Sequence, residues 1–236
     1  MTNLFRRFLY YGVGFGIGLI FVFFFFENRG CSWLPENRVR EMVTDRIVYV
    51  SDSNLKILKN LKIKEEELSR YINTADVLFK KSEKASNPQI YHIEGPTDSK
   101  DNFVSQIIIH KNALTCELVP NQFSAKNMKP TTKGLGKPIH FPSKKNLFYS
   151  DSSAHTICQR KALGIQEDSV LLALFLKNGR INISETDLAK KPKPTYAMTF
   201  KTVQGEEVTF FATYFKEKAR IYKFAFENDK CFKVKK

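Results

Sequence analysis

The four histidines are the residues of this chain whose spacing is most readily tested for chemistry. His155 stands just before a short apolar helical pattern, whereas His92, His110 and His140 lie far from it in the sequence. Catalysis by a side-chain nucleophile needs a base and an orienting group within hydrogen-bond reach, and no Ser/His/Asp or Cys/His set can be argued here. We therefore predict a protein without a catalytic site.

Cysteine spacing argues against a metal centre. Structural zinc sites combine closely spaced Cys and His residues, and the chain holds neither a CxxC pair nor a Cys/His cluster. We predict no metal and no cofactor. If the body of the protein is exported, one disulfide could form among Cys116, Cys158 and Cys231, and spacing decides neither whether it forms nor which two residues form it.

The N-terminal segment has the pattern of a single membrane-spanning helix. Residues 8–26 carry no charge and end in four consecutive phenylalanines. At about 1.5 Å per residue they would form about 28 Å of helix, close to the hydrocarbon thickness of a bilayer. The alternatives are a cleaved signal peptide, a bacterial lipoprotein acylated at Cys31, and a buried core helix. Since Asn28 and Arg29 stand where a lipoprotein needs small or apolar residues, we favour an uncleaved anchor.

Charges beside this segment predict its orientation. Arg6 and Arg7 precede it, which favours a cytoplasmic N-terminus, a location in the inner membrane and a periplasmic body. Two GxxxG pairs lie within it and would let two helices approach closely as a homodimer, although glycine is also simply common in spanning helices. These glycines are Gly12, Gly14, Gly16 and Gly18.

The body is basic. The chain has a formal net charge of +14, and leaving out Arg6 and Arg7 gives a body of +12. Such a balance attracts polyanions, among which we place anionic lipid and envelope polymers above nucleic acid. Nucleic acid is the weaker expectation because we expect the phenylalanines to alternate as core residues do, without a basic stripe interleaved with exposed aromatics.

An internal repeat indicates that the body is two copies of one unit. Residues 55–68 correspond to 157–170 at an offset of 102, and each has a short helix, a Leu-x-Ile break and an acidic turn that opens a second helix. The correspondence continues to 112–118 over 218–224. Alternation predicts strands at 196–202, 207–215 and 219–226, the first two joined as a hairpin.

These patterns predict an α+β fold: a transmembrane helix followed by two similar small units, each of two helices and a small antiparallel sheet. The boundaries are a tail at 1–7, the helix at 8–26, a juxtamembrane segment at 27–50, units at 51–118 and 147–236, and a linker at 119–146.

The linker is rich in proline and lysine and has no acidic residue. We interpret it as a solvated spacer, with contact to an anionic surface as the alternative. The lysines concerned are Lys126, Lys129, Lys133, Lys137, Lys144 and Lys145.

Two stretches resemble known families. Residues 23–39, which include Gly30-Cys31-Ser32-Trp33-Leu34-Pro35, resemble uncharacterised single-pass membrane-anchored proteins of Bacteroidota bacteria. The repeated unit, most clearly from Ser153 to Ile165, resembles a domain of unknown function related to the BrnT toxins, a group with a RelE-like α+β fold. Because some members cleave RNA, the resemblance implies a degenerate ribonuclease as one function to consider.

The departures from this family pattern weaken that implication. The pattern places arginine four residues after the histidine and again just before Gly-Ile, and Gln159 and Leu163 occupy these positions here. His155 and Gly164-Ile165 do match the pattern, so the resemblance implies His155 as the one candidate remnant of a site. In the first unit, Ser53 replaces His155 and Lys62 replaces Gly164. We therefore expect a non-enzymatic, membrane-tethered envelope protein that binds a protein or a polyanion. The alternative is a cytoplasm-facing nucleic-acid-binding protein or a degenerate RelE-like ribonuclease.

Overall fold

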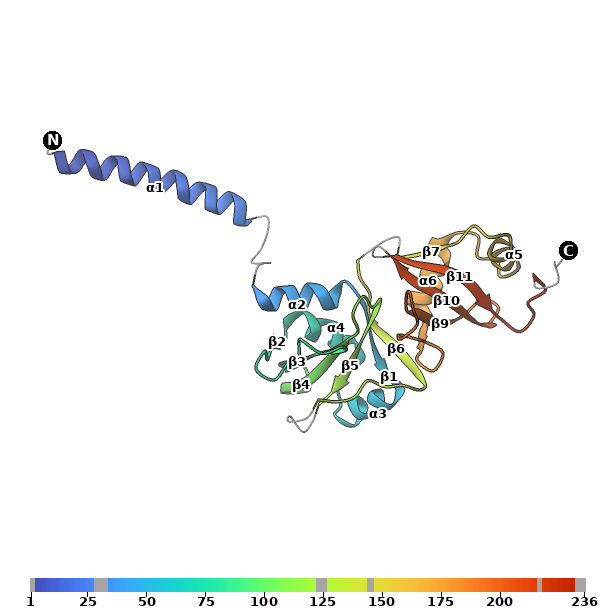
Figure 1. Cartoon of the computed structure of the whole chain (residues 1–236). Coiled ribbons are helices and arrows are strands. Elements are labelled where there is room, and N and C mark those ends of the chain that lie inside the picture. The colour runs from blue at the N-terminus through green and yellow to red at the C-terminus, as the bar shows by residue number, and fades with distance from the viewer. Residues whose placement is uncertain (1–2, 28–33, 122–126, 144–146, 216–217, 232–236) are drawn as a thin grey trace. The chain divides into compact units, whose positions relative to one another are not determined.

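The chain forms two compact units, Met1–Glu41 and Met42–Lys236, each considered by itself. The computed structural model describes residues 3–27, 34–121, 127–143, 147–215 and 218–231, without the side chains of 3, 4, 6, 23–27 and 215. The first unit holds helix α1 (Asn3–Glu27) and the start of helix α2 (Pro35–Thr44). All strands among the described residues belong to the second unit (Figure 1).

The predicted membrane anchor is not supported. Among the residues described, no helix combines the length and the hydropathy needed to cross a bilayer. The prediction for 8–26 is therefore wrong, as are the single-pass anchoring, the cytoplasmic N-terminus, the inner-membrane location and the periplasmic body that rested on it. Within α1, Tyr10 and Tyr11 carry hydroxyls and four glycines add no apolar side chain, whereas the side chains of 23–26 lie outside those described.

The second unit is built on one mixed sheet of eleven strands. Its order is β2-β3-β4-β5-β1-β6-β8-β9-β10-β11-β7. The strands are β1 (Ile47–Ser51), β2 (Asp76–Val77), β3 (Gln89–Thr97), β4 (Lys100–Ile109), β5 (Thr115–Pro120), β6 (Leu135–His140), β7 (Phe148–Ser150), β8 (Arg180–Asn182), β9 (Thr195–Lys201), β10 (Glu207–Phe215) and β11 (Lys218–Ala225). The helices that pack on it are α3 (Asp52–Asn60), α4 (Glu65–Thr74), α5 (Ala154–Ala162) and α6 (Asp168–Asn178).

This sheet corrects the predicted fold class of an α+β protein with two small antiparallel sheets. Two pairs of strands are parallel, β1 with β5 and β7 with β11, so the fold is mixed α/β. Strand β6, from within the segment interpreted as a linker, pairs with both β1 and β8 and makes the sheet continuous. Alternation identifies strands but not their partners, and an unpaired edge of a small sheet is readily completed by a further strand.

Each half of the sheet has the same order of elements. We call residues 47–120 the first half, 121–146 the connecting segment and 147–231 the second half. The first half runs β1-α3-α4-β2-β3-β4-β5 and the second β7-α5-α6-β8-β9-β10-β11, with the same strand neighbours in each. The predicted strand boundaries 196–202, 207–215 and 219–226 agree with β9, β10 and β11 to within one residue.

A left-handed residue ends the first helix of each half. Lys62 has φ 59° and Gly164 has φ 69°. The next residue donates its N–H back into the helix, from Ile63 to Leu58 O at 3.0 Å and from Ile165 to Arg160 O at 2.9 Å. This is the usual way in which a helix satisfies its last carbonyl groups, and it explains the Leu-x-Ile break seen in both sequences.

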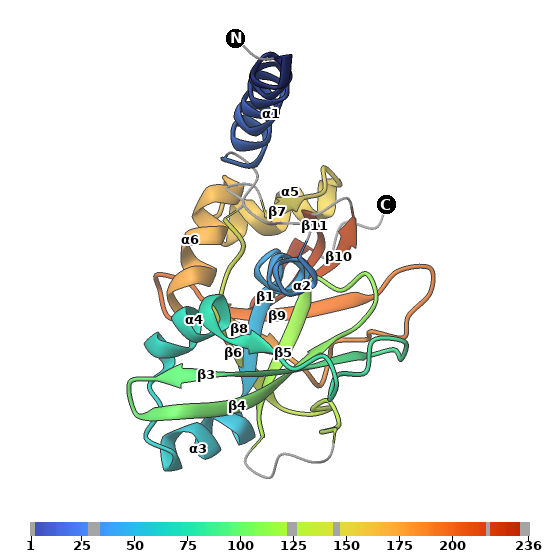
Figure 2. The ribbon, with the colours of Figure 1, turned by 90° about the vertical axis from the view of Figure 1, so that its left-hand side faces the viewer.

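The helices of the two halves lie on opposite faces of the sheet. β8 holds the place in the second half that β2 holds in the first. Strand β2 runs antiparallel to β1, whereas β8, which is joined to β1 by β6, runs parallel to β1. The second half therefore repeats the first with its strand directions reversed. In Figure 2, α3 lies at the lower end of β1, and α6 lies above β6 and β8. Tyr49 of β1 belongs to the hydrophobic core around Phe175 of α6, so this core extends beneath the first half.

Candidate functional site

His155 lies in the first turn of α5, where it is partly buried. The helix is capped next to it by Ser153, whose Oγ accepts the N–H of Thr156 at 3.2 Å. The structure does not bring the other histidines to this place, since His92 belongs to β3 and His140 to β6. Across the described part of the chain, no group of three His, Cys, Asp or Glu residues could hold a metal ion.

Gln159, at the arginine position of the family pattern, fixes α5 to the sheet. It is fully buried. Its Nε2 donates to Phe224 O at 2.6 Å and to Asp229 Oδ2 at 2.6 Å, and its Oε1 accepts the Phe224 N–H at 3.0 Å. An arginine has no acceptor for that N–H, so this position serves the packing of α5 on β11 rather than contact with a phosphate.

One of the three candidate disulfide pairings is present. Cys158 of α5 is bonded to Cys231, with a Cα–Cα distance of 5.9 Å. Cys116 is free and buried, and burial raises the pKa of its thiol to about 12. Cys31 lies outside the described residues.

Three of the six lysines of the connecting segment lie among the described residues. Lys137 of β6 is paired with Glu65 at the start of α4, whereas Lys129 and Lys133 are exposed. Lys126, Lys144 and Lys145 lie outside the described residues. A Cβ added to Gly12, Gly14, Gly16 or Gly18 would meet no atom within 4 Å, so the dimer contact at these glycines stays a prediction.

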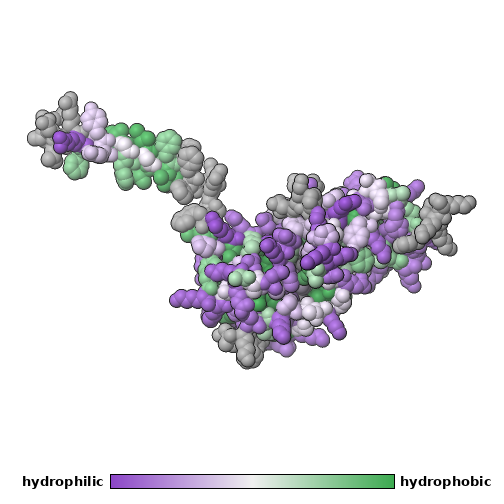
Figure 3. Space-filling view, viewed as in Figure 1, coloured by the Kyte–Doolittle hydropathy of each residue, from purple (hydrophilic) through white to green (hydrophobic). Residues whose placement is uncertain are grey.

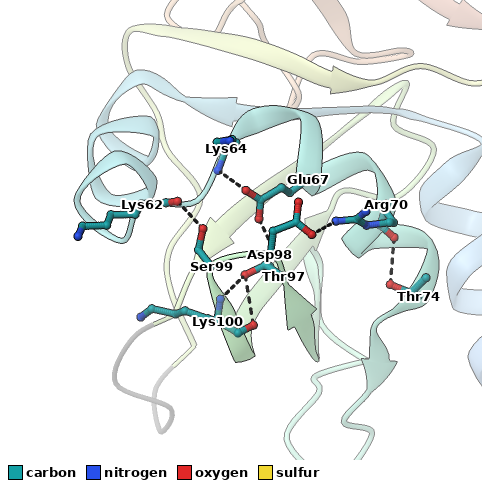
Figure 4. Close-up of polar contacts among 9 residues, drawn as sticks. All are labelled: Lys62, Lys64, Glu67, Arg70, Thr74, Thr97, Asp98, Ser99 and Lys100. Atoms are coloured by element: carbon teal, nitrogen blue, oxygen red, sulfur yellow. Dashed lines mark hydrogen bonds and ion pairs between the residues drawn. The ribbon is translucent and has the colours of Figure 1, made fainter.

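A polar cluster joins α4 to the turn between β3 and β4 (Figure 4). Glu67 is buried and accepts two backbone N–H groups, from Lys64 at 3.2 Å and from Asp98 at 2.9 Å. The Ser99 hydroxyl donates to Lys62 O at 2.6 Å, and Arg70 pairs with Asp98. Because this carboxylate is occupied by the chain itself, the cluster fixes the turn and offers no site for a ligand.

The connecting segment covers the helix-free face of the first half. Met128 donates its N–H to Gln106 Oε1 at 2.7 Å, and Thr131 donates its N–H to Glu117 Oε2 at 2.8 Å. His92 Nε2 lies 2.8 Å from Asn127 Oδ1. These bonds satisfy polar side chains on the sheet with backbone and side-chain groups of the connecting segment, which covers them.

Glu117 has a buried carboxyl group on the helix-free face of the first half. Burial is the largest influence and raises the pKa of Glu117, although hydrogen bonds from Thr131, Ser51 and Asn54 lower it in part. Thr131 Oγ donates to it at 2.5 Å and Asn54 Nδ2 at 3.2 Å. A carboxylate held by this many donors anchors the connecting segment.

A cavity of about 260 Å³ lies where the two halves meet. It is lined by Tyr49 of β1, Ile181 of β8, Thr131 of the connecting segment and the loop 186–189. Burial lowers the pKa of His110 on its wall. The cavity is smaller than most ligand pockets, which have about 300–1,000 Å³, and we assign it no ligand.

The helix-free face of the second half presents aromatic and basic side chains together. Phe210 faces the core, so its neighbour Phe211 faces the opposite side. The register between β10 and β11 shifts at Phe211, where Phe211 pairs with Lys223 and Ala212 with Ile221. Tyr222 is therefore the extra residue of a β-bulge, and it lies beside Lys223 on the face of Phe211.

Strand pairing extends this surface to the edge strand. Arg220 pairs with Thr213 of β10 on one side and with Tyr149 of β7 on the other, so all three share this face. We call this surface the open face. Its members are partly or fully exposed: Tyr149, Thr209, Phe211, Thr213, Lys218, Arg220, Tyr222 and Lys223.

Distances within the open face show close contact between rings and cations. The centroids of Phe211 and Tyr222 are 6.5 Å apart, and Lys223 Nζ lies 5.6 Å from the Phe211 centroid. Arg220 is exposed and forms an ion pair with Asp151, in which its Nη2 lies 3.5 Å from Asp151 Oδ2. Figure 3 shows that hydrophilic side chains cover most of the visible surface of the unit Met42–Lys236.

The sequence interpretation missed this surface because it took the phenylalanines as core residues. The adjacent Phe210 and Phe211 did carry a signal, since two neighbours in a strand cannot both face the core. The side of Tyr222 could not be inferred, because a bulge breaks the alternation on which such an inference depends.

Comparison with known proteins found no matching family model, no similar curated protein and no similar solved structure. The resemblance to the anchored Bacteroidota proteins and to the BrnT-related domain therefore stays a prediction.

Proposed function

We propose that this protein binds an anionic polymer through the open face and does not act on it chemically. The observation that carries the proposal is the bulge in β11, which places Tyr222 and Lys223 side by side next to Phe211 on a face that no helix of the second half covers. Cations on a shallow sheet surface attract a chain of phosphates, sulfates or carboxylates more readily than a small ligand, which needs a concave pocket.

The distribution of charge also favours binding at the second half. The first half has 10 Lys+Arg and 10 Asp+Glu and is neutral. Residues 147–236 have 16 Lys+Arg against 10 Asp+Glu, and residues 121–146 have 6 Lys and no acid. The excess positive charge therefore lies entirely outside the half whose helix-free face the connecting segment covers.

Binding of fluorescently labelled inorganic polyphosphate to the full chain tests the proposal. We expect the affinity, followed by fluorescence anisotropy, to fall steeply between about 50 and 200 mM salt as counterions are released. Each of Arg220→Ala and Lys223→Ala should weaken binding by about fivefold, the equivalent of about 1 kcal/mol per cation.

The matched control is Lys177→Ala. Lys177 is exposed on α6, on the other side of the sheet, and its removal changes the net charge by the same amount. We expect little change for this variant. Equal losses for all three variants would mean that net charge and not the open face attracts the polymer, and binding that ignores salt would refute the proposal.

A further inference from the structure

We infer that the polymer is a single-stranded nucleic acid whose bases stack on the aromatic rings of the open face. This inference rests on the proposed function and concerns the same surface. It adds stacking to the attraction between charges, because bases stack on aromatic side chains and polyphosphate has no bases to stack.

Three rings on three neighbouring strands form the stacking surface. Phe211 belongs to β10, Tyr222 to β11 and Tyr149 to β7. Neighbouring strands are about 4.8 Å apart, so side chains on them can contact successive units of one chain that crosses the strands. Base–aromatic stacking tolerates any sequence, since every base has a π face.

The cations lie between the rings along the same strands. Lys218 and Arg220 alternate with the core residues Ala219 and Ile221 on β11, and Lys223 follows the bulge. A strand whose bases lie on the rings carries its phosphates beside them, within reach of these side chains. Aromatic and basic residues combined on one surface are typical of proteins that bind single strands.

Hydroxyl groups complete the surface. Thr209 and Thr213 lie on β10 on either side of Phe211, and the Thr209 hydroxyl is 3.1 Å from that of Thr199. Hydroxyls can donate to or accept from base edges without selecting one base. A duplex hides its bases from a flat sheet, so the surface favours single strands over duplexes.

The test compares two strands of equal charge. A labelled oligothymidylate of about 12 nucleotides and an abasic deoxyribose-phosphate strand of the same length are titrated against the full chain. We expect the oligothymidylate to bind at least about tenfold more tightly. Phe211→Leu and Tyr222→Leu, which keep apolar volume but remove the ring, should each abolish most of that difference.

The outcomes separate the two proposals. If both strands and polyphosphate bind equally and the leucine variants change nothing, the inference about bases is wrong and the proposed binding of anionic polymers stands. If none of the three binds, the proposed function is wrong as well. Far-UV circular dichroism checks that each variant is folded, and should Phe211→Leu fail this check, Tyr222→Leu at the bulge decides the question.

Discussion

Lys62 and Gly164 occupy the same place in the two halves, and only one of them suits its backbone. A residue with a Cβ pays roughly 1 kcal/mol for the left-handed conformation, which glycine adopts freely. A Cβ at Gly164 would meet no atom within 4 Å, so a substitution there causes no steric clash and its effect reports the conformational cost alone.

We therefore expect Gly164→Ala to lower the free energy of unfolding by about 1 kcal/mol. Urea denaturation of the full chain measures this change. Lys161→Ala, on the exposed side of α5, is the control and should be nearly neutral. A loss no larger than that of the control would contradict the account of the helix end.

Glu117 makes stability depend on pH. Its pKa is raised above the ordinary value of 4.5 because burial disfavours the charged form. The stability that its neutral form provides is fully present below pH 4.5 and is lost as the pH rises through the raised pKa of the folded state.

The glutamine of Glu117→Gln cannot ionise, so the stability of the wild type relative to this variant should fall as the pH rises above 4.5. Glu66→Gln, at an exposed carboxylate on α4, is the matched control. Chemical denaturation at several pH values measures the difference. A difference that stays constant or grows with pH would show that the hydrogen bonds from Thr131 and Asn54 outweigh burial.

At the same scale, residue types predicted some local structure and not the binding surface. The acidic turns at Glu65 and Asp168 do begin helices, as the helix dipole favours. His155, which the family resemblance singled out, lies in the first turn of α5, away from the other histidines. The positions of Phe211 and Tyr222 on the open face follow from the pairing of β10 with β11, which cannot be predicted from the residue types alone.

Among the elements, α5 is held by more than packing. The disulfide from Cys158 joins it to Cys231 beyond β11, across a sequence separation of 73 residues. A cross-link that closes a long loop restricts the unfolded chain and typically adds about 2–4 kcal/mol.

Cys158→Ser should therefore lower the free energy of unfolding by about 2–4 kcal/mol, and Cys231→Ser by a similar amount. Thermal unfolding with and without reductant measures it. The reduced wild type is the internal control and should behave like either variant. Equal stability of the oxidised wild type and the variants would show that the disulfide has no role in holding α5.

Element boundaries were more predictable than element partners. Period-two alternation located β9, β10 and β11 because these strands bury one face. It could not show that β6 would enter the sheet from a segment rich in proline and lysine. Nor could hydropathy decide α1, where glycine and tyrosine interrupt the apolar residues.

On the scale of the whole unit Met42–Lys236, one sheet joins the two halves. β6 pairs with both halves, and the Leu114 N–H of the first half donates to Tyr196 Oη of the second at 2.9 Å. Both groups are buried.

We expect one unfolding transition for both halves. Tyr196→Phe leaves the Leu114 N–H without its acceptor and should cost about 1–3 kcal/mol, lowering the transition of both halves together. Hydrogen exchange at increasing denaturant follows each half separately. Two transitions, or a loss confined to the second half, would show that the halves fold independently.

The account as a whole rests on where an anionic polymer binds. Hydrogen exchange followed by mass spectrometry, on the full chain with and without polyphosphate at low salt, locates the contact most directly. We predict protection in β7, β10 and β11 that disappears at high salt. Protection confined to the first half or to the connecting segment would contradict it.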